Sequence, residues 1–245
     1  MTDTIRINKF FTEHGICSRR EADRLIEAGR ITINNVVAKL GDQVGVRDVI
    51  ARDGEVIPWG QVRIYIKYHK PVGVTTTSEA HVPRNIIREI GHPERIFPIG
   101  RLDKDSSGLI LLTNDGDIVN EILRTEFGHE REYEVTVDRL CDQAVLDRLS
   151  AGVVLLGSKT KPCRVERLGP RRFRMVLTEG KNRQIRRMCQ AVGYRVVVLH
   201  RVRIMHITLA GLPSGMWKPL SASEHQELLS AVRAQSLKRS NAEDL

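Results

Sequence analysis

The spacing of apolar residues predicts two short helices at the start of the chain. The first ends at Gly15, and the second begins at Ser18, where Ser18 and Glu21 form a capping box. Apolar residues recur three or four positions apart, as the inner face of a helix requires, at Ile7, Phe10, Phe11, Ala22, Leu25 and Ile26. Arg19 and Arg20 fall in the first turn of the second helix. Cations there oppose the helix dipole, so a nearby phosphate is favoured over plain solvation.

A pattern of period two follows and predicts a β-hairpin. Its strands are Ile31–Ile33 and Val36–Lys39, joined by a tight turn at Asn34 and Asn35. Asp53-Gly54 and Pro58 are interpreted as the end of this segment and the start of a linker. Residues 1–60 are therefore predicted to form a small α/β module.

Residues 61–235 are predicted to form a second, larger domain, followed by a polar tail over 236–245. Strands are expected at Val62–Tyr68, Leu109–Leu112, Tyr133–Val137, Arg172–Leu177 and Val196–Leu209. Helices are expected near Asp117–Arg124, Asp142–Ser150, Asn182–Val192 and Ser223–Ala234. Because strands and helices do not alternate regularly and no repeat is present, the pattern indicates an α+β domain with a mainly antiparallel mixed sheet and flanking helices.

Composition narrows the class of protein. The chain has 245 residues, 41% of them apolar and 28% charged, which suits two modest folded domains. No run reaches the ~18 apolar residues of a membrane helix, and Met1–Asn8 lacks the apolar core of a signal peptide. We therefore expect a cytoplasmic protein with no membrane partner. The four cysteines are far apart and without a C-x-x-C pair, so they are expected as small buried side chains: Cys17, Cys141, Cys163 and Cys189.

The positive charge is concentrated in one segment. The formal net charge is +9, yet Lys159–Arg203 alone carries 14 lysine and arginine residues against two glutamates, a local charge of +12. Apolar residues alternate with these cations, namely Phe173, Met175, Ile185, Met188 and Val196. A segment with that periodicity must fold, so a basic groove for a polyanion is favoured over a disordered tail.

The densest polar stretch is the loop Gly100–Gly108, which leads directly into the apolar strand Leu109–Leu112. It places Asp103 at the rim of a core, where the surroundings can tune a carboxylate. Four of its residues also match the first ligand positions of a calcium loop: Asp103, Asp105, Ser107 and Gly108. The twelfth position is Asn114 instead of the glutamate such loops need, so a calcium site is not predicted.

A metal-dependent phosphodiesterase is a second possibility for the acidic residues, because it needs convergent carboxylates. The candidates are Asp103, Asp105, Asp115 and Asp117. The last two follow the strand, whose residues rise ~3.3 Å each, so the four cannot converge on one metal site. No Walker loop, G-x-S-x-G elbow or dinucleotide glycine pattern is present, and the histidines show no metal or triad spacing. The sequence therefore predicts no metal site.

Two parts of the sequence resemble known families. Cys17–Val37, with its S-R-R-E-A helix and hairpin, is similar to the small RNA-binding domain named after ribosomal small-subunit protein four. The segment Gly100–Gly116 resembles the catalytic loop of the pseudouridine synthases; it reads G-R-L-D-K-D-S-S-G-L-I-L-L-T-N-D-G. Three further blocks agree with these synthases in the same order along the chain: Lys70–Gly73, Arg131–Val135 and Glu179–Met188. The arrangement is similar to that of the A-type synthase of small-subunit ribosomal RNA and the B-, E- and F-type synthases of large-subunit ribosomal RNA. Arg84-Asn85-Ile86 and the stretch from Arg203 to Trp217 are most similar to the F type.

The resemblance implies a reaction and a set of site residues. Asp103 would act at the ribose C1′, the glycosidic bond to uracil would break, and the base would rotate and rejoin through C5 without a cofactor. Arg101 would hold the extruded nucleotide, Tyr133 would stack on the uracil, and Arg186 would pair with Asp103. From the residues alone, Asp103 could instead cap the loop and Tyr133 could be a core residue.

The remaining cations are expected to bind RNA. In the predicted helix Asn182–Val192 they form a cationic face with phosphates as the favoured ligand, and the full set of expected RNA contacts is Arg19, Arg20, Lys181, Arg183 and Arg187. We expect a monomeric enzyme acting on large-subunit (23S) ribosomal RNA, either naked or in an assembly intermediate. Small-subunit ribosomal RNA or transfer RNA is the alternative substrate, and a non-catalytic RNA-binding assembly protein is the alternative function.

Overall fold

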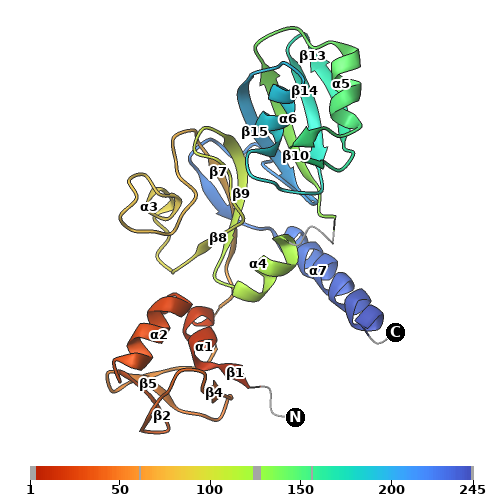
Figure 1. Ribbon diagram of the computed structural model, residues 1–245. Coiled ribbons are helices and arrows are strands. Elements are labelled where there is room, and N and C mark those ends of the chain that lie inside the picture. The colour runs from red at the N-terminus through yellow and green to blue at the C-terminus, as the bar shows by residue number, and fades with distance from the viewer. Residues whose placement is uncertain (1–3, 61, 124–127, 156, 244–245) are drawn as a thin grey trace. The chain divides into compact units, whose positions relative to one another are not determined.

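The computed structural model describes residues 4–60, 62–123, 128–155 and 157–243, and it divides the chain into two compact units (Figure 1). The N-terminal unit contains Met1–Ile64 together with the short segments His92–Ile96 and Thr113–Gly116. The C-terminal unit contains Tyr65–Gly91, Phe97–Leu112 and Asp117–Leu245. Each unit has hydrophobic clusters of its own.

The N-terminal unit contains the predicted helices and hairpin. Its elements are β1 (Ile5–Arg6), α1 (Ile7–Glu13), α2 (Arg19–Glu27), β2 (Ile31–Ile33), β3 (Val36–Val37), β4 (Gln43–Val44), β5 (Ile50–Arg52) and β6 (Glu55–Ile57). Four strands form an antiparallel sheet in the order β3-β2-β5-β6, and β1 pairs with β4. The Ser18 hydroxyl caps α2 by accepting a hydrogen bond from the Glu21 amide at 3.2 Å. The apolar faces predicted for both helices are buried.

Asp53 and Gly54 do not mark the end of the module. They form the tight turn that joins β5 to β6, with φ angles of 51° and 86°. An Asp-Gly pair favours left-handed backbone at both central positions, which is the requirement of a two-residue hairpin turn. The interpretation of this pair as a boundary is therefore wrong, because the chain continues into a further strand of the same sheet.

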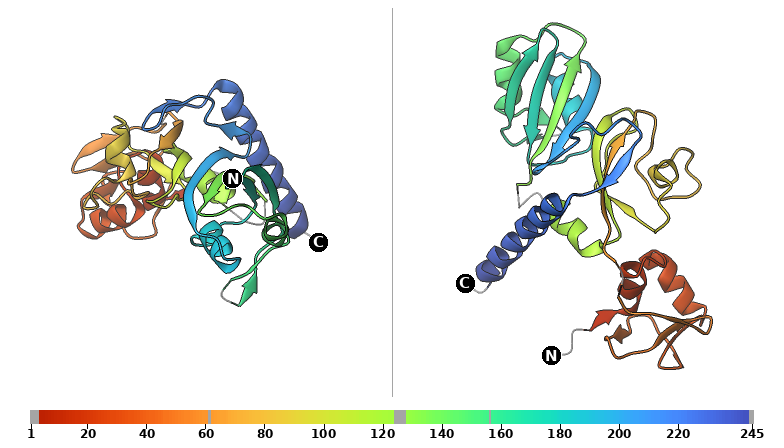
Figure 2. Two further views of the ribbon diagram at one scale, coloured as in Figure 1. Left: turned by 90° about the horizontal axis from the view of Figure 1, so that it is seen from above. Right: turned by 180° about the vertical axis from the view of Figure 1, so that it is seen from behind.

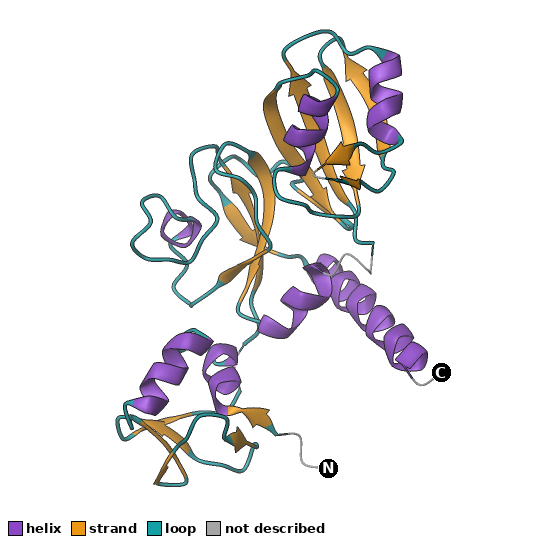
Figure 3. Ribbon diagram, in the orientation of Figure 1, coloured by secondary structure: helices purple, strands orange, loops and turns teal. Residues whose placement is uncertain are grey.

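The C-terminal unit is built on a nine-stranded sheet (Figure 3). Its strands are β7 (Tyr65–Lys70), β8 (Phe97–Ile99), β9 (Ser107–Thr113), β10 (Arg131–Val137), β13 (Arg164–Gly169), β14 (Arg172–Leu177), β15 (Val196–Ile204), β16 (Ile207–Thr208) and β17 (Trp217–Pro219). The main path runs β13-β14-β10-β15-β9-β7-β17; β16 pairs with β15 and β8 with β9. The strands β10, β13, β14, β16 and β17 pair antiparallel with their neighbours, whereas β15 and β9 are parallel, so the predicted α+β class with a mainly antiparallel mixed sheet is confirmed.

Among the described residues, five helices accompany this sheet: α3 (Ile86–Ile90), α4 (Gly116–Leu123), α5 (Gln143–Ser150), α6 (Gln184–Ala191) and α7 (Ala222–Glu243). The helices α5 and α6 pack with β10, β14 and β15 around one hydrophobic cluster. Figure 1 shows both helices on one side of these strands, and the view from behind shows the strands in front of them (Figure 2). A short pair, β11 (Val154–Leu155) with β12 (Ser158–Lys159), lies near α6. A second cluster joins β7 and β9 to α4 and α7.

Several boundaries differ from the sequence expectations. The predicted strand Val196–Leu209 is split into β15 and β16 by a turn, where Met205 has a φ of 52°. The strand expected from Val62 begins at Tyr65 as β7, and α6 begins at Gln184 instead of Asn182. The sequence pattern does not predict short elements such as α3, β8 and β17, because so few residues carry too little periodicity. The strand β13 is as long as β14, but its two apolar residues, Val165 and Leu168, are three positions apart and do not alternate.

The C-terminal helix is longer than predicted. The expected helix ends near Ala234, whereas α7 continues to Glu243. Residues 235–243 contain no glycine or proline and include alanine, leucine, lysine and arginine, all good helix formers, so nothing in them stops the helix. In the part of the chain that the structure describes, none of the helices has the length and apolar character needed to span a membrane.

Candidate active site

A cavity of about 470 Å³ in the C-terminal unit brings together residues that are far apart in the sequence. It is lined by the loop before β9, by β10 and β15, and by the segment that leads into α6. Its polar lining includes five of the residues predicted for the site, which are Arg101, Asp103, Tyr133, Lys181 and Arg183. The structure therefore gathers most of the sequence-predicted site around one cavity.

Asp103 is placed there by the strand that follows it. Leu109–Leu112 are buried, and at Gly108 the strand β9 lies against β15, with Gly108 paired to Arg201. A Cβ atom at Gly108 would lie 2.2 Å from the Arg201 carbonyl oxygen, and the φ of 113° is accessible only to glycine. The glycine therefore permits the close strand contact that brings the Asp103 loop to the cavity.

Arg183 is the cation that lies within ion-pair distance of the Asp103 carboxylate in the described part of the chain. Its Nη1 lies 3.7 Å from Asp103 Oδ2, and the same guanidinium donates two hydrogen bonds to the Asp105 carboxylate at 3.2 and 3.0 Å. The hydrogen bond from Arg183 lowers the pKa of Asp105, and the same contact raises the pKa of Arg183. The Asp103 side chain is 28% exposed, so it is partly shielded but still accessible to a ligand in the cavity.

The predicted pairing of Arg186 with Asp103 is wrong in this structure. Arg186 donates to the Asp105 carbonyl oxygen at 2.8 Å, to Ser106 Oγ at 3.1 Å and to the Val196 carbonyl oxygen at 3.3 Å. Its Nε also lies 3.4 Å from the Asp105 carboxylate. The helix α6 begins only at Gln184, so Arg183 precedes it in left-handed backbone, where its side chain contacts the carboxylates. Helical spacing could not reveal this, because Arg183 lies outside the helix.

Tyr133 lies both at the edge of the hydrophobic core and at the cavity. It lies on β10, packs partly buried against the cluster under α5 and α6, and lines the cavity. Arg101 is exposed at the cavity. Lys181 also lines it and donates to Ser158 Oγ at 3.0 Å, whereas Arg187 donates to the Asn182 side-chain oxygen at 3.0 Å.

The remaining two predicted RNA contacts lie in the N-terminal unit. Arg19 and Arg20 are both exposed in the first turn of α2, as expected. Of the cysteines, Cys17, Cys141 and Cys189 are buried as predicted, and burial raises the pKa of each thiol.

Two buried arginines of the cavity were missed by the sequence reasoning. Arg201 on β15 is 3% exposed and donates to the carbonyl oxygens of Leu109 at 2.7 Å and Arg101 at 3.4 Å. Arg131 on β10 is 9% exposed and donates to the Ile122 carbonyl oxygen at 3.3 Å, and burial lowers its pKa. Arg131 begins the block Arg131–Val135 and Arg201 lies in the basic segment Lys159–Arg203, but neither pattern indicates that these two side chains are buried at the cavity.

The Lys70–Gly73 block supports the loop that carries Asp103. Lys70 is fully buried and donates to the carbonyl oxygens of Pro71 and Val74 at 2.9 and 2.8 Å. Burial lowers the pKa of Lys70 to about 8, against the opposing attraction of Asp105. The Gly73 amide donates to the Lys104 carbonyl oxygen at 2.7 Å, which ties this block directly to the loop.

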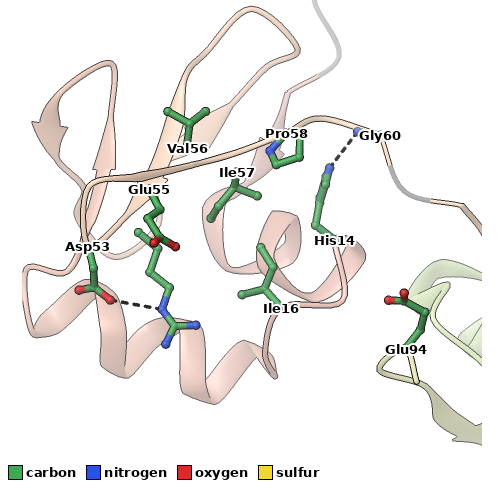
Figure 4. A pocket seen from close by; sticks show the side chains of 10 residues that line it. His14, Ile16, Asp53, Glu55, Val56, Ile57, Pro58, Gly60 and Glu94 are labelled. Atoms are coloured by element: carbon green, nitrogen blue, oxygen red, sulfur yellow. Dashed lines mark hydrogen bonds and ion pairs between the residues drawn. The ribbon is translucent and has the colours of Figure 1, made fainter. Parts of the chain in front are cut away.

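A larger cavity, of about 750 Å³, lies in the N-terminal unit (Figure 4). Its lining includes His14, Asp53, Glu55 and Glu94, but none of the predicted catalytic residues. The carboxylate of Asp53 is already paired with Arg30 at 2.6 Å. The size of this cavity does not by itself make it a reaction site, which requires convergent polar groups suited to a reaction.

The described residues contain no cluster of three or more histidine, cysteine or acidic side chains that could hold a metal ion. Asp103 and Asp105 precede β9, whereas Asp115 and Asp117 follow its end at Thr113, as expected from the sequence. The reactive groups that line the cavity are two carboxylates, a tyrosine, a lysine and several guanidinium groups.

Comparison with known families agrees with this arrangement. Residues 64–191 match the family described as RNA pseudouridylate synthase, and residues 5–50 match the S4 domain. The chain belongs to the RNA pseudouridylate synthases, and it carries an S4 domain at its N-terminus.

Individual relatives define the subgroup. The chain is 47% identical over 239 residues to the dual-specificity RNA pseudouridine synthase RluF of Salmonella typhi, covering 96% of this chain and 83% of that protein. It is 32% identical over 232 residues to the ribosomal large subunit pseudouridine synthase B of Bacillus subtilis, covering 91% and 95%. A solved crystal structure of a pseudouridylate synthase superimposes with a TM-score of 0.67 at 28% identity, covering 91% of this chain and 99% of that one. The resemblance found in the sequence is confirmed, including its similarity to the F type.

Proposed function

We propose that this enzyme isomerises a uridine of large-subunit ribosomal RNA to pseudouridine, with Asp103 as the catalytic carboxylate. The observation that carries the proposal is the cavity in which Asp103, Tyr133 and Arg101 meet. Its membership in the RNA pseudouridylate synthases and its similarity to the RluF relatives support the reaction class. The similarity to a ribosomal large subunit synthase supports the choice of RNA.

In this proposal the reaction begins when Asp103 acts at the ribose C1′ of the bound uridine. A carboxylate can stabilise or attack a cationic sugar, and the Arg183 guanidinium lies 3.7 Å from that of Asp103. The bond from C1′ to N1 breaks, the uracil turns within the cavity, and C5 forms the new bond to C1′. The proton on C5 is then lost and N1 gains one, so no cofactor is needed.

The other residues hold the nucleotide in place. A uridine in structured RNA must leave its stack before C1′ can be reached, and a flat side chain compensates for the lost stacking. Tyr133, partly buried at the cavity, is suited to this role, and Arg101 is exposed where it can hold the extruded nucleotide. Arg186 acts as a positioning residue, because it fixes the carbonyl of Asp105 and the hydroxyl of Ser106.

Binding of the RNA is assigned to cations on both units. Lys181, Arg183 and Arg187 near α6 would contact phosphates next to the target, and Arg19 and Arg20 of the S4 domain would add contacts elsewhere on the RNA. The proposed domains are 1–60 for RNA binding and 61–235 for catalysis. We infer a monomer that works in the cytoplasm, where bacterial ribosomal RNA is found.

Transfer RNA is proposed as a second substrate. The support comes from the RluF relatives, which are described as dual-specificity RNA pseudouridine synthases. Parallel assays with large-subunit ribosomal RNA, small-subunit ribosomal RNA and transfer RNA test this choice, with pseudouridine located by chemical labelling and sequencing. Product in small-subunit RNA only would contradict the proposed substrate.

The catalytic assignment is tested by the variants Asp103→Asn and Asp105→Asn. The first keeps the shape of the side chain and removes its charge, so pseudouridine formation should stop while RNA binding persists. The second removes a carboxylate of the same loop that is already paired with Arg183, so turnover should be reduced but retained. Two results would assign the catalytic role to Asp105 instead of Asp103. One is turnover by Asp103→Asn above a few per cent of wild type, and the other is complete loss of turnover in Asp105→Asn.

A further inference from the structure

Within the ranges that the structure describes, two buried arginines of the cavity are not paired with a carboxylate. Arg131 and Arg201 both line it, and both are at least nine-tenths buried. Among the residues that the structure describes, the hydrogen-bond acceptors of these two side chains are backbone carbonyl oxygens, and no carboxylate lies within ion-pair distance of either. Arg203, two residues further along β15, is different, because it is paired with Glu130 and Glu132 at 2.8 Å each.

A buried guanidinium without a carboxylate is costly, because the charge has lost its water and has gained only carbonyl dipoles in exchange. The burial of Arg131 and its repulsion from Arg201 both lower the pKa of Arg131. Such a charge favours an anion in the neighbouring cavity, and a low dielectric constant makes the attraction stronger than it would be in water. Two such arginines at one cavity indicate that an anionic species occupies it at some stage of the reaction.

The two arginines lie on the side of the cavity where the base is expected. Tyr133 and Arg201 are cross-strand partners on β10 and β15, and the Arg201 guanidinium carbon lies 6.0 Å from the centre of the Tyr133 ring. A uracil stacked on Tyr133 is therefore close to this charge. Arg101 and Lys181, by contrast, are exposed, and exposed cations suit RNA phosphates, which keep part of their hydration.

We propose that Arg131 and Arg201 stabilise the negative charge that develops on the uracil when its glycosidic bond breaks. The electron pair of the C1′–N1 bond stays with the base, whose charge spreads over N1, O2 and O4, while Asp103 balances the electron-poor C1′. When C5 later donates an electron pair to C1′, the new bond cancels the negative charge of the base against the positive charge of the sugar. The base then loses the C5 proton and gains one on N1, which leaves its charge unchanged and completes the pseudouridine. This inference rests on the proposed function and assigns to the two arginines a role at the leaving group.

The test compares two substrates and a series of variants in single-turnover reactions. The substrates are the same RNA with uridine or 5-fluorouridine at the target position, and the readout is the disappearance of the unreacted nucleotide. Fluorine withdraws electrons, so the detached fluorouracil anion needs less help from the protein. The variants are Arg201→Gln and Arg131→Gln, which remove the charge, and Arg201→Lys, which keeps it. Arg203→Gln is the matched control, since it removes an arginine of β15 that is neutralised by glutamates.

If the proposal holds, Arg201→Gln slows the reaction of uridine by about 100- to 1,000-fold, the range expected for loss of a preorganised donor in an active site. The reaction of 5-fluorouridine is slowed less, and Arg201→Lys recovers most of the lost rate although it cannot reproduce the hydrogen bonds to Leu109 and Arg101. Arg131→Gln shows the same difference between substrates, and RNA affinity is unchanged throughout. Any effect of Arg203→Gln is equal on both substrates.

A purely structural role for Arg201 predicts another result. Its loss would loosen the loop before β9, so Arg201→Gln and Arg201→Lys would slow both substrates to the same extent, and Arg131→Gln would behave like Arg203→Gln. That result overturns the inference and leaves the proposed function intact. Should Arg201→Gln fail to fold, as judged by circular dichroism, the same comparison with Arg131→Gln decides. Failure of the wild-type enzyme to form pseudouridine would instead overturn the proposed function itself.

Discussion

Arg183 and Arg186 differ in what they do for the protein, and replacing each with methionine should separate their roles. Arg186 is 13% exposed and donates hydrogen bonds to the Asp105 carbonyl, the Ser106 hydroxyl and the Val196 carbonyl. Arg183 is 44% exposed and bonds mainly to the Asp105 carboxylate, which is itself 48% exposed. The first arginine therefore joins α6 to the loop and to β15, whereas the second forms a surface ion pair.

The expected loss of stability follows from these contacts. A hydrogen bond with a charged partner contributes about 1.5–3 kcal/mol, but such contributions are not additive, and methionine retains part of the packing of the arginine stem. We expect Arg186→Met to lower the free energy of unfolding by about 2–4 kcal/mol. Exposed ion pairs contribute about 0–1 kcal/mol because water screens them, so Arg183→Met should cost less than about 1 kcal/mol.

Urea denaturation followed by tryptophan fluorescence measures this difference. The two tryptophans lie in different units, so a Trp59→Phe background leaves Trp217 as the reporter of the C-terminal unit. With a typical slope of about 2 kcal/mol per molar urea, the midpoint should fall by about 1–2 M for Arg186→Met and by less than about 0.5 M for Arg183→Met. Equal shifts for the two variants, or a shift under about 0.5 M for Arg186→Met, would refute this interpretation of the two side chains.

Three further predictions concern other parts of the molecule. Gly108→Ala should destabilise the C-terminal unit by about 3 kcal/mol or more, measured by the same urea titration, because the new Cβ would meet the backbone of β15 at 2.2 Å and the φ is unfavourable. The pKa of Asp105 should lie below that of a free carboxyl and should rise in Arg183→Gln, as followed by NMR. The lowered pKa stabilises the folded protein modestly at pH values above the unfolded-state pKa of about 4. This stabilisation is lost as the pH falls through the lowered pKa of the folded state. Replacing Arg19 and Arg20 with alanine should weaken RNA binding and make its salt dependence shallower, by a slope of about 1 for each phosphate that is no longer bound, while single-turnover rates at saturating enzyme stay unchanged. An unchanged slope would show that these two arginines do not bind phosphate.

Much of this protein is determined by its local sequence. The capping serine, the Asn34-Asn35 turn and the apolar periods act over a few residues, so the two N-terminal helices, the first hairpin and strands such as β9 and β14 could be predicted. The clustered charge indicated a polyanionic partner, and the loop around Asp103 indicated the reaction class. These features depend on backbone propensity and on side-chain order along the chain, both of which are properties of the sequence itself.

The tertiary structure alone determines which charged side chains contact one another. Whether Arg183 or Arg186 lies at Asp103 depends on the residue at which α6 begins and on the left-handed backbone of Arg183, which tertiary contacts impose. The burial of the two cavity arginines likewise could not be predicted from the sequence, since an arginine in a strand is usually at the surface. Electrostatic contacts act between side chains brought together by packing, over distances that have no relation to their spacing along the chain. A linear pattern can therefore identify the groups that react, but only the folded chain determines which partner each of them has.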